Sequence, residues 1–262
     1  MKKYSLLPSL KQPVLGQTFK EKYVQTIGIL NTNLQEFHPA KQMVAWSGGK
    51  DSTLILYLIR QECEALGIDP HEIHVEFHNT GVEYPQTIKF IRKLTTDWDL
   101  NLIETRPIKS FWQCVKEYGY PKPKSARIKD TGKPQMAQCC KFLKEAPALK
   151  SLKENGWECI YLGITAVESH QRQIRAVTHG TCYHNKSENV KKVHPILYWT
   201  EQEVWDAHRM FNIPYNTIYD MGVDRCGCMP CTAYKKWQEN LQKTHPKMYK
   251  KIMRDMGQQL IS

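Results

Sequence analysis

The sequence predicts an α/β fold, in which a mostly parallel sheet of five strands is covered by helices on both faces. Short apolar or alternating stretches recur along the chain, and stretches with helical spacing separate them. This alternation is typical of parallel sheets, because each crossover places a helix on a face of the sheet. The chain has 262 residues, 41% of them hydrophobic and 24% charged, which suffices for one sizeable core with additions at its ends.

The elements follow one another in a regular order. Strands are predicted at residues 42–46, 71–80, 100–106, 159–165 and 190–199. Helices are predicted near 19–34 and at 52–66, 85–98, 110–119, 140–156 and 200–211. Pro147 should interrupt the fifth helix, and Thr200 with Glu203 has the spacing of a capping box before the sixth. The expected division is an N-terminal extension (1–39), a central domain (40–224) and a C-terminal segment (225–262).

Basic residues are concentrated in two stretches. Residues 109–153 carry eleven Lys or Arg against three acids, and residues 232–262 carry seven against two. Such charge suits a polyanion such as nucleic acid, although a solvated basic face, or a buried anion to be neutralised, would explain it too. In the second stretch, Trp237 and Tyr249 lie among the basic residues, where they either contact a polynucleotide or pack a terminal helix.

Composition also indicates a compartment. No stretch approaches the roughly 18 apolar residues of a membrane span, and the N-terminal residues lack the apolar region of a signal peptide. A cytoplasmic protein without a membrane partner is therefore expected. In such a chain, nine cysteines favour metal or redox use over structural disulfides.

The segment MVAWSGGKDST (Met43–Thr53) has the features of a phosphate cradle. A strand that runs into a glycine-rich turn and then a helix gathers backbone N–H groups and the positive end of the helix dipole. The cradle would use two glycines for close approach, three hydroxyl groups and one ammonium group: Gly48, Gly49, Ser47, Ser52, Thr53 and Lys50. The string differs from the P-loop motif, and Gly-Gly-Lys alone would favour an ordinary strand-to-helix turn.

The full string SGGKDST (Ser47–Thr53) resembles the signature of the PP-loop ATP pyrophosphatases, in the adenine nucleotide alpha hydrolase-like group, whose fold is Rossmann-like. NTGVEYP (79–85), LGITAVESHQR (162–172) and the stretch 195–222 are similar to elements of phosphoadenosine phosphosulfate reductase relatives. The sequence is identified as a member of that family over residues 42–232. It departs from the family pattern at Asn79, where Asp is usual, and at Thr165, where Arg is usual.

The resemblance implies that ATP and Mg²⁺ bind at this turn, with Lys50 and Asp51 as catalytic residues. It implies a wider nucleotide and metal environment of Ser47, Gly48, Gly49, Lys50, Asp51, Ser52, Thr53, Thr80, Gly81, Glu83, Gly163, Glu168 and Arg172. For Glu83, Glu168 and Arg172, structural ion pairing is the alternative. Asn79 would weaken a Mg²⁺ or ribose contact, and Thr165 would remove a cationic ligand.

Four cysteines have a spacing suited to metal binding. Cys139-Cys140 and the pair Cys228 and Cys231 offer the four thiolates that a structural zinc or a [4Fe–4S] cluster requires, and spacing alone leaves both open. The arrangement resembles the signature of the iron–sulfur sulfonucleotide reductases, which implies a [4Fe–4S] cluster with zinc as the alternative. The Cys-x-x-Cys half is shared with the ATP-pyrophosphatase subunits of DNA phosphorothioation systems. Cys226 would replace a ligand, carry sulfur or be inert.

Two enzymatic functions stay open at this point. A sulfonucleotide reductase would attack adenylyl sulfate, or its 3′-phosphate, with a cysteine from a C-terminal Glu-Cys-Gly motif, and no cysteine follows Cys231 in this sequence. The expected function is therefore an ATP pyrophosphatase that adenylates an oxygen of nucleic acid, DNA rather than tRNA, for sulfur insertion. Its expected protein partner is a cysteine desulfurase or another sulfur donor, and self-association into a homodimer is open. The intact SGGKDST string argues against a binding module without turnover.

Overall fold

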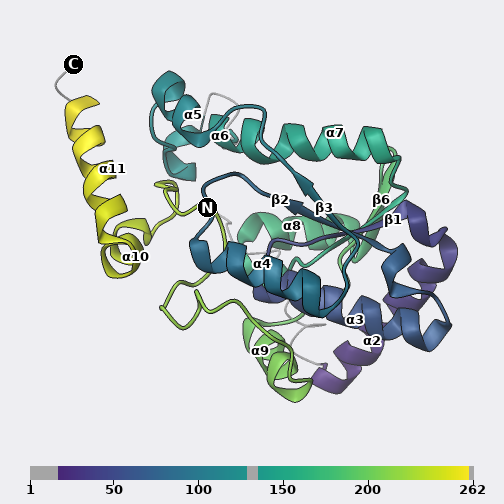
Figure 1. Cartoon of the computed structure of the whole chain (residues 1–262). Helices are drawn as coiled ribbons and strands as arrows, with labels where there is room; N and C mark the ends of the chain where they lie inside the picture. Colours follow the sequence, from purple (N-terminus) through teal and green to yellow (C-terminus); the bar gives the residue numbers. More distant parts are fainter. Residues whose placement is uncertain (1–16, 129–134, 260–262) are drawn as a thin grey trace, which may run out of the picture. The chain divides into compact units, whose positions relative to one another are not determined.

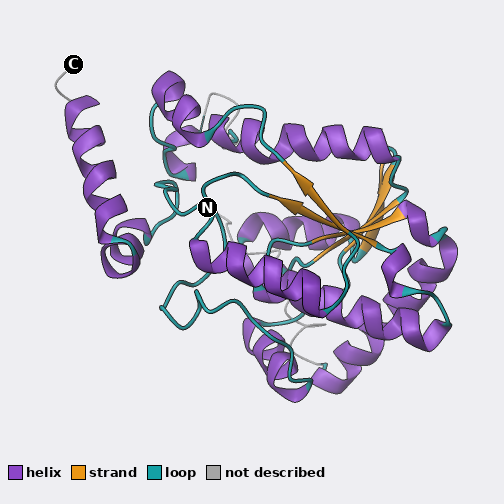
Figure 2. Ribbon diagram, in the orientation of Figure 1, coloured by secondary structure: helices purple, strands orange, loops and turns teal. Residues whose placement is uncertain are grey.

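The computed structural model describes residues 17–128 and 135–259, and it confirms the predicted α/β class (Figure 1). Its strands form one mostly parallel sheet in the order β3-β2-β1-β4-β6-β5 (Figure 2). The strands are β1 (Gln42–Ala45), β2 (His74–His78), β3 (Leu102–Thr105), β4 (Cys159–Leu162), β5 (Cys182–Asn185) and β6 (Val190–Val193).

The sheet has six strands in the described residues, where the sequence predicted five. β1 pairs in parallel with β2 and β4, and β4 pairs in parallel with β6. The additional strand, β5, is antiparallel to β6. Its residues, CYHN, give no apolar alternation, so the pattern that predicts strands is missing there. The strand predicted at 190–199 ends at Val193, shortly before Pro195, which has no N–H for a sheet hydrogen bond.

The helix boundaries follow from local chemistry. Thr18, Ser110 and the predicted Thr200 each form a capping box, and Gly67 ends the second long helix with φ 71°. The helices are α2 (Phe19–Glu36), α3 (Lys50–Leu66), α4 (Pro85–Asp97), α5 (Phe111–Tyr118), α6 (Gln138–Cys140), α7 (Ala146–Asn155), α8 (His170–His179), α9 (Glu201–Met210), α10 (Trp237–Thr244) and α11 (Pro246–Gln259). Among the described helices, none combines the length and the apolar composition needed to cross a bilayer.

The prediction of helices was incomplete at α8. This helix buries only Ala176, and its remaining residues are mostly polar, so its sequence lacks a wide apolar stripe. Short 3₁₀ turns complete the secondary structure at Pro39–Lys41, Pro70–Glu72, Lys124–Arg127 and Ala166–Glu168.

The chain divides into two compact units, each built from three segments. Unit 1 contains the described parts of residues 1–77, 93–103 and 153–215, and unit 2 contains those of 78–92, 104–152 and 216–262. The domain boundaries predicted after residues 39 and 224 stay predictions. Residues 1–16 of the predicted extension lie outside the described residues, as do Lys129 and Lys133 of the first basic stretch.

Helix α2, predicted as part of an extension, packs against α3 in unit 1 (Figure 1). Leu30 and Leu34 of α2 are fully or almost fully buried. The indole N–H of Trp199 donates to the Thr26 hydroxyl at 3.0 Å, and that hydroxyl donates to the carbonyl of Pro195 at 2.9 Å. These buried contacts make α2 part of the core of unit 1.

Unit 2 has a separate hydrophobic core, which contains one of the predicted cysteines. Phe111, Leu143 and Ile252 lie in this core with Cys139, and the partly buried Cys228 packs against it. The core therefore joins the segment of the cysteine pair to the C-terminal helices.

Pro147 does not interrupt its helix, contrary to the prediction. The chain forms a π-helical turn at Lys141–Glu145 and continues directly into α7, with Pro147 in the first turn of that helix. Proline is tolerated there, because the π turn shifts the hydrogen-bond register just before Pro147, which has no N–H to donate. The carbonyl of Phe142 accepts a hydrogen bond from the N–H of Ile108 at 3.3 Å instead.

Candidate functional site

The predicted phosphate cradle lies in unit 1, between β1 and α3. Gly48 has φ 71°, a conformation that favours glycine, and Gly49 is the N-cap of α3 without a side-chain hydrogen bond. The hydroxyls of Ser47 and Ser52 are 3.1 Å apart, and Ser52 also donates to the carbonyl of Gly49 at 3.1 Å. The two serines thus hold the turn that leads into the helix.

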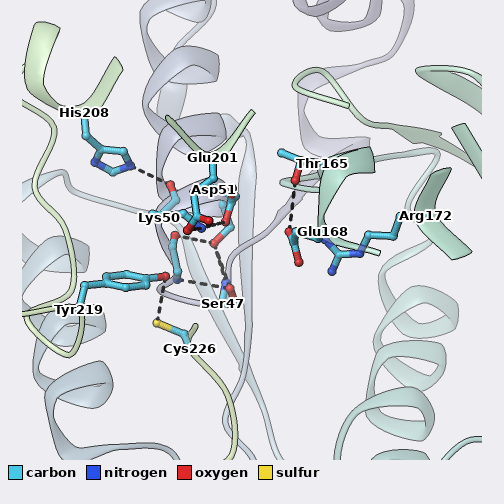
Figure 3. Close-up of polar contacts among 12 residues, drawn as sticks. Ser47, Lys50, Asp51, Thr165, Glu168, Arg172, Glu201, His208, Tyr219 and Cys226 are labelled. Carbon is cyan, nitrogen blue, oxygen red and sulfur yellow. Dashed lines mark hydrogen bonds and ion pairs between the residues drawn. The ribbon is translucent and has the colours of Figure 1, made fainter. Parts of the chain in front are cut away.

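Lys50, the first residue of α3, is buried and surrounded by carboxylates (Figure 3). Its Nζ lies 3.1 Å from Asp51 Oδ2 and 3.4 Å from Glu201 Oε1. Burial opposes the charge of the ammonium group, but Asp51, Glu201 and Glu168 outweigh burial and raise the pKa of Lys50. Lys50 is therefore a fixed cation at the positive end of a helix.

Two residues near Lys50 were not predicted. Glu201 begins α9, directly after the capping residue Thr200. His208 of α9 lies with Nε2 2.9 Å from the Lys50 carbonyl oxygen and Nδ1 3.2 Å from that of Ile213 (Figure 3). Glu201 and His208 are seven positions apart, so they lie on the same face of α9. Nothing in the sequence indicates which element packs against that face.

Gly163 is held against the phosphate cradle by close packing. A Cβ atom at this position would lie 2.6 Å from both Cα and N of Ser52. Such a distance to backbone atoms is not tolerated, so the chain after β4 requires glycine to pass the first turn of α3. Thr53 is fully buried, and its hydroxyl accepts from the indole N–H of Trp46 at 3.0 Å. The structure thus brings Gly163 to the cradle and gives Thr53 a supporting position within it.

Glu168 and Arg172 form an ion pair with each other at the start of α8 (Figure 3). Thr165, where the family pattern has Arg, is 1% exposed, and its hydroxyl lies 3.5 Å from Glu168 Oε1. The ion pairing that the sequence left open as an alternative is therefore present for both charged residues. Glu168 also contributes to the raised pKa of Lys50, so the pair belongs to the same electrostatic environment.

Thr80, Gly81 and Glu83 lie in unit 2, where their loop contacts the C-terminal cysteine segment. Glu83 Oε1 accepts hydrogen bonds from the N–H and the hydroxyl of Thr80, at 3.1 and 2.5 Å. Glu83 forms an isolated β-bridge with Cys228, and the Thr80 hydroxyl lies 3.5 Å from Cys228 Sγ. The sequence placed this loop and Cys228 in different sites, whereas the structure makes them neighbours.

The local contacts of Asn79 explain why this chain has Asn where the family pattern has Asp. The Asn79 amide donates to Glu104 Oε1 at 3.1 Å, while its oxygen accepts from the N–H of Gly81 at 2.9 Å. Aspartate could accept from Gly81 but could not donate to Glu104, and it would add a second negative charge there. The amide therefore suits both partners.

The four cysteines predicted as metal ligands all belong to unit 2. Cys139 and Cys140 hydrogen-bond to each other, and Cys140, Cys228 and Cys231 line one cavity of about 70 Å³. Within the described residues, no group of three or more Cys, His, Asp or Glu side chains is arranged as a metal site. The donor set has the chemistry of a cluster site, while ligation by all four thiols stays a prediction.

Cations surround these thiols. The pKa of Cys140 is lowered because Cys139 hydrogen-bonds to it and because nearby basic side chains stabilise its thiolate. Those side chains are Lys144, Arg127 and Arg225. The pKa of Lys144 is raised, mainly by Cys228, because each charge favours the other. Both Lys144 and Arg225 line the cavity and would offset the negative charge of thiolate ligands.

Cys226 does not line that cavity, but hydrogen bonds fix its position. The Asn216 amide donates to Cys226 Sγ at 3.3 Å and to the Thr87 hydroxyl at 2.9 Å. Cys226 in turn donates to the Tyr219 hydroxyl at 3.7 Å (Figure 3). The three roles that the sequence left open for Cys226 all stay open.

Fold and cradle together define an α/β protein with a predicted phosphate cradle between β1 and α3. Residues 41–234 match the phosphoadenosine phosphosulfate reductase domain family, so the chain belongs to that family. It is 34% identical over 214 residues to an uncharacterized protein of Methanocaldococcus jannaschii, covering 80% of this chain and 40% of the relative. It is 28% identical to adenosine 5′-phosphosulfate reductase of Bacillus cereus, over 79% of each chain.

Two solved structures share the fold. FMN adenylyltransferase of Candida glabrata in complex with ATP has a TM-score of 0.56 and 15% identity, covering 86% of this chain and 70% of that one. The U34-tRNA thiolase of Methanococcus maripaludis, with its [4Fe–4S] cluster, has a TM-score of 0.52 and 15% identity, covering 92% and 80%. At these identities the likeness shows the fold alone.

Proposed function

We propose that the chain is an ATP pyrophosphatase that adenylates an oxygen of nucleic acid, DNA rather than tRNA, in preparation for sulfur insertion. The observation that carries the proposal is the pairing of Lys50 with the carboxylates of Asp51 and Glu201 at the N-terminus of α3. Mg²⁺ is usually bound by one or two carboxylates together with substrate phosphates. The cradle therefore offers ligands for Mg²⁺ and ATP in one place, whereas a sulfonucleotide without a metal would meet these carboxylates as like charges.

The chain's own groups have distinct tasks in this reaction. The backbone of Gly48 and Gly49, the helix dipole and the Lys50 ammonium would bind the β- and γ-phosphates and stabilise pyrophosphate as it leaves. Asp51 and Glu201 would hold the Mg²⁺, which supplies further neutralisation of phosphate charge. His208 would fix the first turn of α3 through the Lys50 carbonyl.

The cysteine cavity of unit 2 would hold a [4Fe–4S] cluster, with zinc as the alternative. Cys139, Cys140, Cys228 and Cys231 would be its ligands, and a bound cluster would supply redox-active iron with affinity for sulfur. The thiolate tendency of Cys140 and the positions of Lys144 and Arg225 support this assignment. The sulfur itself would come from a cysteine desulfurase or another donor protein.

Exposed basic residues of unit 2 support a polyanionic substrate. Six of the seven basic residues in the second stretch are exposed: Lys235, Lys236, Lys243, Lys247, Lys250 and Arg254. Trp237 and Tyr249 pack against the core of unit 2, with their rings 6.2 Å apart, so packing accounts for these two aromatic residues. Electrostatic contact with phosphates is therefore the stronger support for nucleic acid.

A sulfonucleotide reductase is the second candidate. The similarity to adenosine 5′-phosphosulfate reductase of Bacillus cereus over 79% of both chains favours it. Such an enzyme would use the same cradle for the adenylyl group and would reduce sulfate sulfur to sulfite.

One experiment separates the two candidates. Anaerobically purified protein receives either ATP, Mg²⁺ and DNA, with pyrophosphate as the readout, or adenylyl sulfate or its 3′-phosphate with thioredoxin, with sulfite as the readout. We expect pyrophosphate and no sulfite, and sulfite without pyrophosphate would refute the proposal. A tRNA arm run in parallel tests DNA as the substrate, because higher pyrophosphate release with tRNA would overturn that choice.

Metal analysis of the same sample tests the cluster. We expect iron and acid-labile sulfide near four per chain, the composition of one [4Fe–4S] cluster. Replacing Cys228 with Ser should remove most of the iron, whereas replacing Cys63, a buried cysteine of α3 in unit 1, should leave it unchanged. Stoichiometric zinc without iron would assign the site to zinc instead.

A further inference from the structure

Unit 1 contains a cavity of about 230 Å³, formed by α8, β5, β6 and the segments next to them. Three cations, Arg172, Arg175 and Lys192, line it with His194, Tyr183 and aliphatic side chains. Of these residues only Arg172 belongs to the predicted nucleotide environment. No acidic side chain of the described chain is part of the lining.

The cations of this cavity are only partly neutralised. Arg172 pairs with Glu168, and Lys192 pairs with Glu188, both of which lie outside the lining. Arg175 has no ion pair among the described residues and is exposed. The cavity thus retains a positive charge that its neighbours do not balance.

His194 is the buried polar group of the cavity. It is 8% exposed, and its Nδ1 has no hydrogen-bond partner within the described part of the chain. Burial, with added repulsion from Lys192, Arg172 and Arg175, lowers the pKa of His194 to about 4, so its ring is neutral near pH 7. A buried nitrogen without a partner is unfavourable, and a ligand that donates a hydrogen bond to it removes this cost.

We propose that this cavity binds a small oxyanion, a phosphate or sulfate group, either as the free ion or at the end of a small molecule. Arg175 and Lys192 would supply charge-assisted hydrogen bonds, and Arg guanidinium groups suit tetrahedral oxyanions. The neutral ring of His194 donates its one N–H to the Leu162 carbonyl, so Nδ1 would accept a hydrogen bond from a P–OH group of phosphate, which sulfate lacks. The volume lies below the roughly 300 Å³ at which pockets for drug-sized ligands begin, which indicates a ligand of few atoms.

This inference goes beyond the function proposed for the phosphate cradle, although the cavity shares Arg172 with the predicted nucleotide environment. The oxyanion site consists of groups on α8, β5 and β6, whereas the cradle consists of groups on the turn before α3 and on α9.

The test is calorimetric titration of the full chain with inorganic phosphate and, separately, with sulfate. The titration is repeated in a Lys50→Ala background, which disables the cradle as a competing anion site. We expect binding in both backgrounds and about tenfold weaker binding after Arg175→Gln, because one charge-assisted hydrogen bond is lost. Arg175 is exposed, so this variant should fold normally.

A matched control removes a positive charge elsewhere in unit 1. Arg209→Gln on α9 replaces an exposed arginine paired with Asp206 and should leave the affinity unchanged. Binding of phosphate but not sulfate would assign the site to phosphate groups, and the reverse result to sulfate groups. Failure of both anions to bind, or binding that Lys50→Ala abolishes and Arg175→Gln does not weaken, would overturn the proposal.

A second readout follows His194 itself. In protein labelled with ¹⁵N-histidine, phosphate should shift the Nδ1 resonance that is missing from a His194→Gln variant, and sulfate, which has no O–H to donate, should shift it less. A His194 resonance that stays constant while the anion binds would show that the anion lies elsewhere.

Discussion

The two units differ in how their functional residues are distributed along the chain. In unit 1 the phosphate cradle is one string, Ser47–Thr53, whose turn and helix start form within seven residues. In unit 2 the cysteines come from two segments, separated by residues 153–215 of unit 1. A local string specifies its own geometry, whereas distant thiols depend on the packing of the helices that carry them.

The units also differ in the protection of their reactive groups. Lys50 is 6% exposed and paired with carboxylates, so its environment is complete within unit 1. Cys140, Cys228 and Cys231 are partly exposed and line a cavity with room for an additional group. The charged group of the cradle thus already has its partners, whereas the thiols of unit 2 are placed to bind a further group.

The largest effect is expected at the cradle. Lys50→Ala should reduce pyrophosphate release about 10²- to 10³-fold, because a preorganised charge at the leaving group is lost. Iron content should be unchanged, since the cysteines belong to unit 2. Lys93→Ala, at an exposed lysine of α4 paired with Asp97, is the control and should retain activity. If Lys50→Ala also lost iron, nucleotide chemistry in unit 1 and iron binding in unit 2 would not be separate functions.

Gly163→Ala tests the close packing of the cradle. The added Cβ would collide with the Ser52 backbone, so unfolding free energy should fall by about 3 kcal/mol, at the upper end for overpacking. Gly28→Ala in α2, where no atom lies within 4 Å, should stabilise by about 0.5–1 kcal/mol instead. Urea unfolding measures both. Equal effects at the two glycines would contradict the packing seen at Gly163.

Acid should destabilise both units through one desolvated histidine in each. Burial lowers the pKa of His194 in unit 1 and of His78 in unit 2 to about 4, against about 6.5 in the unfolded chain. The unfolded state then binds more protons between these values, so this stability is present above pH 6.5 and is lost as the pH falls toward 4. At pH 5, each histidine should lower the unfolding free energy by about 2 kcal/mol relative to its value above pH 6.5.

Urea unfolding at pH 7.5 and pH 5 measures this loss. The variants His194→Gln and His78→Gln should each show a smaller difference between the two pH values than the unmodified chain. If one variant keeps the full difference, the histidine it replaces is not buried in its neutral form.

The smallest effect is expected from removing the helix caps, which can be compared between the two units. Thr200 in unit 1 and Ser110 in unit 2 each accept a hydrogen bond from the N–H three residues later, at 3.2 Å, and both form capping boxes. Replacing either with Ala should lower the unfolding free energy by about 1 kcal/mol. Scanning calorimetry would show whether both substitutions shift the same transition. If removing one cap shifted no unfolding transition, the helix that it caps would not unfold cooperatively with the rest of its unit.

Sequence reasoning worked where a few neighbouring residues determine the structure. The turn between β1 and α3 and the cap at Thr200 could be predicted, because the required groups lie within seven residues of one another. The contacts of Glu201 and His208 with Lys50 could not, because they depend on how α9 packs against α3. The neighbourhood of Glu83 and Cys228 was missed for the same reason.

The π-helical turn at Lys141–Glu145 has a consequence for how this chain tolerates deletions. A π turn contains one residue more than an α-helical turn, and it lies between the cysteine pair and α7. Deleting one residue there would restore uniform α-helix and rotate Cys139 and Cys140 by about 100° relative to α7. Cys140 would then leave the cavity, although every cysteine would remain in the sequence. At this point the spacing between residues matters as much as their identity.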